Sequence, residues 1–98
     1  ADAVLALALV HHLAISGNLP LGHIANFFAT AGRNVLVEFV PKSDSRVQHL
    51  LRSREDIFSD YSEAGLVAAL APYFTTRWRQ TLPGSSRVLY ALTRRSAP

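Results

Sequence analysis

Residues 2–13 constrain the fold more than any other stretch of the chain. An acid at Asp2 precedes an almost unbroken apolar run, Ala3–Val10, which ends in the paired histidines His11 and His12. Such a run is typical of a strand that is buried on both faces, as in a parallel sheet covered by helices. A buried helix gives the same pattern, because alanine and leucine are good helix formers. The residues that follow decide between the two.

The next forty residues predict a βαβ unit. We expect a strand at residues 3–8, a short helical turn at 9–15, a helix from 19 to 31 and a second buried strand at 35–40. A strand, a crossover helix and another strand are the parts of a parallel pair. The helix spacing of 3.6 residues predicts that its inward face consists of Leu21, Ile24, Phe27, Phe28 and Ala31.

The second half of the chain predicts two more helices and a hairpin. Ser43 or Asp44 is expected to cap a short helix, and Ser62 is expected to start another that ends near residue 71. The inward face of this later helix is predicted to hold Leu66, Val67 and Leu70.

Two strands complete the predicted sheet. Residues 74–82 alternate, which places Phe74, Thr76 and Trp78 on one face, whereas residues 87–93 are apolar on both faces. The turn residues between them, Pro-Gly-Ser-Ser, predict an antiparallel hairpin with the last strand more buried than its partner.

The pattern Asp-x-Val-Leu-x₅-His-His-Leu, followed by a helix ending in Ala-Gly and an apolar strand ending in Glu-Phe, resembles a known enzyme family. It is similar to the segment from the fourth to the fifth strand of class I S-adenosylmethionine-dependent methyltransferases. The nearest likeness is to a bacterial group related to nodulation-type methyltransferases. The resemblance covers nearly all of this chain but only the C-terminal half of such an enzyme.

This resemblance implies an α/β fold. The expected architecture is a partial Rossmann-like methyltransferase sheet with flanking helices, made of three parallel or near-parallel strands and a C-terminal antiparallel strand. In the family's numbering the strands would lie in the order fourth, fifth, seventh, sixth. Residues 1–98 would form a single domain, the C-terminal half of the methyltransferase domain, with the N-terminal cofactor-binding half absent.

The expected cofactor is the methyl donor S-adenosylmethionine, and its site would be incomplete in this chain. The five glycines, at positions 17, 22, 32, 65 and 84, are scattered, so none belongs to the glycine-rich loop that such folds use for ligand binding. No acidic residue that would bind a ribose stands at the end of a second strand of such a site. We therefore expect this chain alone to be inactive, and its enzyme status rests on the resemblance.

The resemblance places candidate site residues around the end of the first strand. Ala8 and Leu9 would line the cofactor site, and Asp2 matches the acid that precedes the fourth strand, close to the cofactor's edge. His11 and His12 are the candidate catalytic residues, because a histidine can accept the acceptor's proton near neutral pH. The alternative is that one histidine packs or caps the helix while the other faces solvent. No metal site is expected, since adjacent histidines point to different helix faces.

Glu38 and Asp44 are the candidate substrate-binding residues. Glu38 ends a buried strand, where ligands collect in open α/β sheets. A buried carboxylate must be paired or protonated, so Glu38 either forms an ion pair or faces a cleft. Asp44 follows in the next loop and either borders the acceptor pocket or serves as a surface or capping residue.

Composition limits the expected partners and location. The chain has a net charge of +3, with arginines gathered in its C-terminal third, which suits a solvated strand face or an anionic partner. We expect no membrane segment and, with no cysteine, a cytoplasmic protein. Nucleic acid is not the expected partner, but the basic C-terminal third leaves a nucleic-acid-binding domain as a third alternative. The methyl acceptor is left open. The exposed edge at residues 3–8 predicts self-association, and a non-catalytic interaction or oligomerisation module on the same half-sheet is the alternative function.

Overall fold

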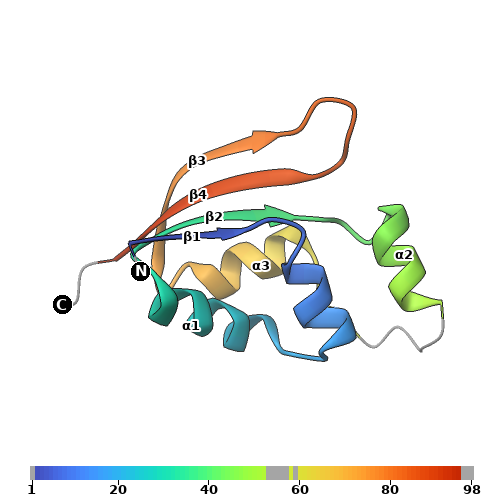
Figure 1. Cartoon of the computed structure of the whole chain (residues 1–98), viewed down its shortest axis with the longest axis horizontal. Coiled ribbons are helices and arrows are strands. Elements are labelled where there is room, and N and C mark those ends of the chain that lie inside the picture. The colour runs from blue at the N-terminus through green and yellow to red at the C-terminus, as the bar shows by residue number, and fades with distance from the viewer. Residues whose placement is uncertain (1, 53–57, 59, 96–98) are drawn as a thin grey trace.

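A mixed four-stranded sheet forms the body of the protein. The computed structural model describes residues 2–52, 58 and 60–95. The strands are β1 (Ala3–Ala6), β2 (Asn34–Phe39), β3 (Phe74–Thr81) and β4 (Val88–Arg94), and they lie in the order β1-β2-β4-β3 (Figure 1). β1 pairs with β2 in parallel, and β4 is antiparallel to both of its neighbours. The predicted strand order and directions are therefore confirmed.

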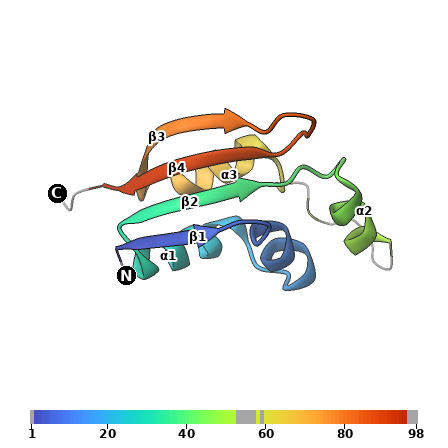
Figure 2. The same ribbon diagram turned by 45° about the horizontal axis from the view of Figure 1, so that its top comes forward.

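All the described helices lie on the same side of the sheet or beyond its end. They are η1 (His12–Ser16), α1 (Leu21–Ala31), α2 (Ser45–Leu51) and α3 (Glu63–Leu70). α1 and α3 pack beneath the strands, whereas α2 follows the end of β2, and the turned view shows the opposite sheet face without a helix over it (Figure 2). The result is two layers with one open sheet face.

The core lies between this sheet and the helices α1 and α3. On β2, Val35, Val37 and Phe39 point toward the helices and are buried, as expected for alternating positions of a strand. Phe28 of α1 and Leu66 of α3 meet them and are fully buried. The hydrophobic effect on these apolar side chains holds the two layers together.

Side-chain caps start two of the helices where the sequence predicts them. The Asp44 carboxylate accepts a hydrogen bond from the Arg46 backbone N–H at 2.9 Å, ahead of α2. The Ser62 hydroxyl accepts one from the Gly65 N–H at 2.9 Å, ahead of α3. Each cap satisfies a donor that the first helical turn leaves unpaired.

The first strand is shorter than expected, because the chain turns after Ala6 instead of continuing to Ala8. Ala8 has a φ of 54°, in the left-handed region, which a strand residue does not adopt. The chain then enters a helical segment whose last turn is π-helical, since the Gly17 N–H bonds to the His12 carbonyl at 2.9 Å. A Cβ at Gly17 would lie 2.8 Å from the Leu13 carbonyl oxygen, so glycine suits this turn.

Four side chains that the sequence predicts to face inward are exposed: Phe27, Val67, Thr76 and Trp78. Trp78 is 47% exposed because a β-bulge between Thr76 and Trp78 shifts the strand register, so that Trp78 pairs with Ala91 and leaves the helix-covered face. Phe27 on α1 and Val67 on α3 also point away from the core. By contrast, β4 is more buried than β3, as predicted.

Candidate functional site

Polar groups gather where the parallel strands β1 and β2 end. This carboxyl edge is where ligands bind in open α/β sheets. The loop after β1, the start of α2 and the first residues of β4 all reach it, because β4 runs antiparallel and its Val88 pairs with Phe39 at the end of β2. We call the four side chains that meet there, His11, Glu38, Asp44 and Arg87, the edge cluster.

Glu38 is held by two partners. Its side chain is 9% exposed, and its Oε1 accepts a hydrogen bond from the Ala8 backbone N–H at 2.8 Å. The same oxygen lies 3.7 Å from Nη1 of Arg87. Of the two alternatives that the sequence leaves open, the structure therefore has the ion pair.

Arg87 joins Asp44 to Glu38. Its Nε and Nη2 donate to the two carboxylate oxygens of Asp44, at 3.1 and 3.4 Å. The hydrogen bond from Arg87, reinforced by the Arg46 N–H, lowers the pKa of Asp44 below its usual value. The same hydrogen bond raises the pKa of Arg87. Asp44 thus both caps α2 and forms an ion pair.

His11 and His12 are brought together but differ in environment. Their ring centroids are 4.4 Å apart, and His11 is fully buried whereas His12 is exposed. Within the described part of the chain, neither ring nitrogen of His11 has a hydrogen-bond partner. Burial, with smaller contributions from the charges of His12 and Arg87, lowers the pKa of His11 to about 4. The ring is therefore neutral at pH 7 and retains a free proton-accepting nitrogen.

The remaining predicted site residues lie at opposite ends of β1. Ala8 and Leu9 are half-buried and follow the strand directly, next to the edge cluster. Asp2 precedes the strand, and its backbone oxygen accepts hydrogen bonds from the Asn34 N–H at 2.9 Å and from Asn34 Nδ2 at 3.2 Å. The structure therefore does not bring Asp2 together with the other candidates.

Sequence reasoning did not single out Arg87 as a site residue. It stands 43 residues from Asp44, so no local pattern connects the two. The signal that points to it is topological: an antiparallel final strand inserted beside β2 must begin at the carboxyl edge, so a charged residue at its start faces that edge.

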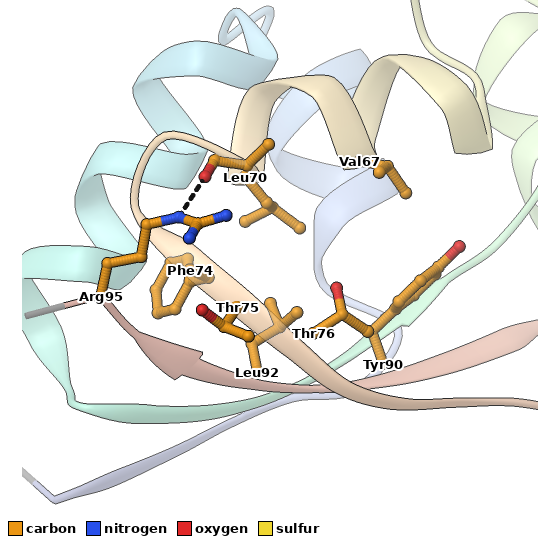
Figure 3. A pocket seen from close by; sticks show the side chains of 9 residues that line it. Val67, Leu70, Phe74, Thr75, Thr76, Tyr90, Leu92 and Arg95 are labelled. Atoms are coloured by element: carbon orange, nitrogen blue, oxygen red, sulfur yellow. Dashed lines mark hydrogen bonds between the residues drawn. The ribbon is translucent and has the colours of Figure 1, made fainter.

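A separate cavity of about 120 Å³ lies beside α3, away from the edge cluster (Figure 3). Apolar side chains form most of its wall, among them Leu70, Phe74 and Leu92. Arg95 closes one side by donating from Nε to the Ala71 carbonyl at 2.8 Å. None of the predicted site residues lines this cavity.

Residues 2–52, 58 and 60–95 contain neither a metal-binding cluster nor a membrane-spanning helix. No group of three or more histidine, aspartate or glutamate side chains there is placed to bind a metal ion. None of the helices in the same ranges has the length and apolarity needed to cross a membrane.

Comparison with known proteins gives one relative of interest. The chain is 45% identical over 94 residues to the nodulation protein NoeA of Rhizobium meliloti (strain 1021). The aligned part is 96% of this chain but 20% of NoeA, so the chain spans about one fifth of the length of the curated relative that it matches. No family model matches the sequence, and no solved structure matches the chain. The chain is thus similar in sequence to part of a nodulation protein.

Proposed function

We propose that this chain is the C-terminal part of an S-adenosylmethionine-dependent methyltransferase. The observation that carries the proposal is the edge cluster at the carboxyl ends of β1 and β2, where His11 lies near two carboxylates and Arg87. His11 is buried there and has no hydrogen-bond partner among the described residues. The strand order, with an antiparallel strand between the second and the last, supports it because class I methyltransferases are expected to have this order.

The described residues fit one wall of such a site and not the whole of it. The loop Leu7–Leu9 can face the donor, but the described chain has no glycine-rich loop between a strand and a helix. The donor-binding half would come from another part of a longer protein. The fivefold greater length of the relative is consistent with that division.

The edge cluster has groups suited to the acceptor side of the reaction. S-adenosylmethionine, when bound, supplies an electrophilic methyl group. His11, neutral because its pKa is lowered to about 4, can accept a proton that the acceptor releases. The main contribution of the protein would be to hold donor and acceptor in line.

The edge of β1 suits the arrival of the remaining half. β1 is an outer strand, so its backbone groups on one side have no sheet neighbour among the described strands. Leu5 is 70% exposed there, and Leu7 is exposed as well. A separate apolar groove, between η1 and α1, is lined by Leu13, Leu19, His23, Ile24 and Phe27. Exposed apolar surface of this kind marks an interaction site.

The test is a calorimetric titration of S-adenosylmethionine into the 98-residue chain and, in parallel, into the longest natural protein that contains it. We expect binding by the longer protein alone. The double variant His11→Ala/His12→Ala of that protein should lose methyl transfer, whereas the control His49→Ala, an exposed histidine on α2, should retain it. Failure of both proteins to bind the donor would refute the proposal.

The exposed β1 edge also favours a second candidate, a non-catalytic module that self-associates through residues 3–8. Light scattering on the 98-residue chain tests it, with Leu5→Lys at the edge and Val67→Lys on α3 as the matched control. A dimer that only Leu5→Lys disrupts would support this function. A monomer at high concentration would exclude it.

A further inference from the structure

The hydrogen bond between Glu38 and Ala8 assigns Glu38 a role different from ligand contact. We propose that Glu38 is a positioning residue: its carboxylate, held in place by Arg87, fixes the loop after β1 in the shape in which that loop meets the methyl donor. The inference rests on the proposed function for the identity of the ligand. The loop itself, Leu7–Leu9, is defined by the structure alone.

The backbone at Ala8 needs an external partner to keep its shape. Its φ of 54° brings the alanine Cβ close to backbone oxygen, a contact that glycine would avoid. The hydrogen bond from its N–H to Glu38, at 2.8 Å, links it to a residue 30 positions away on β2. Non-glycine residues in this conformation persist where surrounding structure fixes them, and they cluster at functional sites.

Arg87 holds the Glu38 carboxylate at the same oxygen as the loop's N–H donor and links it to Asp44. Its Nη1 lies 3.7 Å from Glu38, and its other two donor nitrogens hold Asp44. The contacts therefore run from Asp44 through Arg87 and Glu38 to Ala8. They connect the start of α2, the start of β4, the end of β2 and the loop after β1. With one carboxylate oxygen committed to two partners, Glu38 serves the loop more directly than it can serve an acceptor.

The loop in turn leads into the candidate base. Only two residues separate Ala8 from His11, and the Leu9 carbonyl accepts the Leu13 N–H at 3.1 Å in the first helical turn. A loop that is free to change its backbone at Ala8 would therefore move both its donor-facing residues and His11. Loss of Glu38 should weaken donor binding, because the donor must then order the loop as it binds.

The test compares Glu38→Leu, which removes the acceptor, with Glu38→Gln, which keeps an oxygen for the Ala8 N–H but loses the charge. Glu63→Gln is the matched control, because Glu63 forms an ion pair with Arg79 at 2.7 Å between α3 and β3, apart from the edge cluster. Two quantities are measured: the hydrogen-exchange rate of the Ala8 amide in the 98-residue chain, and the dissociation constant for S-adenosylmethionine in the longer protein.

In Glu38→Leu we expect Ala8 exchange relative to that of Val37 to rise by about tenfold or more, and donor affinity to fall by about the same factor, from the usual strength of a hydrogen bond to a charged group. Glu38→Gln should lie between Glu38→Leu and the parent in both quantities, and Glu63→Gln should change neither quantity.

Unchanged donor affinity in Glu38→Leu would overturn the positioning role. A rise in the KM for the acceptor alone would also overturn it, in favour of substrate contact. A third outcome separates the two proposals: the unsubstituted longer protein does not bind the donor, but Ala8 exchange is still faster in Glu38→Leu. That outcome would refute the proposed function and leave Glu38 as the residue that holds the loop.

Discussion

Replacement of His11 by leucine gives a sharp test of the buried histidine, because it separates stability from function. The ring is fully buried, and among the described residues its two nitrogens have no hydrogen-bond partner. An unpaired polar group in the interior costs free energy that an apolar side chain of similar size does not. We therefore expect His11→Leu to be at least as stable as the parent at pH 7.5, although it should lose the proposed proton acceptor.

The lowered pKa of His11 sets how much the unfolding free energy of the protein should change with pH. The pKa of His11 falls from 6.5 to about 4, mainly through burial, so the unfolded state binds this proton more tightly than the folded state. Well above pH 6.5 the ring is neutral in both states, so its titration adds nothing to the unfolding free energy. Between pH 6.5 and about 4 the folded state loses stability as the pH falls, by roughly 1.4 kcal/mol per pKa unit, or about 2.5 kcal/mol at pH 4.5.

The assay is urea unfolding, followed by far-UV circular dichroism, at several values between pH 7.5 and 4.5. The difference in unfolding free energy between His11→Leu and the parent should grow by about 2.5 kcal/mol over this range. Other titrating groups cancel in that difference. The control His49→Gln, at an exposed site on α2, should follow the parent curve. Parallel curves for His11→Leu and the parent would refute the argument that burial keeps this ring neutral.

Two further predictions concern stability and use the same unfolding assay at pH 7.5. Gly65→Ala should lower the free energy of unfolding by more than about 2 kcal/mol, because the new Cβ would lie 2.0 Å from the Asp60 carbonyl oxygen. Gly22→Ala, which has open space around it in α1, should instead raise the free energy of unfolding by up to about 1 kcal/mol. Equal changes in the two variants would contradict this reasoning. Tyr61→Phe should cost about 1–2 kcal/mol, because its buried hydroxyl donates to the Val40 carbonyl, and no change would show that the bond contributes nothing.

The sheet could be predicted because its signals are local. An apolar run followed by a helix and a second apolar run predicts a parallel pair, and β1 and β2 form one. The final strand is apolar on both faces, which suits a central position, and β4 lies between β2 and β3. Even the caps at Asp44 and Ser62 follow from residue type at a helix start.

The details of the candidate site depend on contacts between distant residues. The sequence around Ala8 does not indicate a left-handed backbone, because the hydrogen bond that accompanies it is donated by the Ala8 N–H to Glu38 on another strand. Likewise the pairing of Arg87 with Asp44 appears only when the hairpin is folded back onto β2. The β-bulge beside Trp78 shifts the strand register by one residue, and the alternation of side chains in the sequence does not indicate where such a shift occurs.

The two outer strands of the sheet differ in a way that bears on function. β3 carries exposed Arg77 and Arg79, and charged side chains discourage pairing with another chain. β1 instead exposes Leu5, which lines a shallow groove on the open sheet face together with Leu36 and Trp78. A parallel strand added at β1 would end next to Ala8 and His11, because parallel neighbours share their carboxyl edge. A partner that covers the exposed apolar side chains of β1 would therefore also reach the edge cluster. The proposed reaction needs the donor-binding half at that same place.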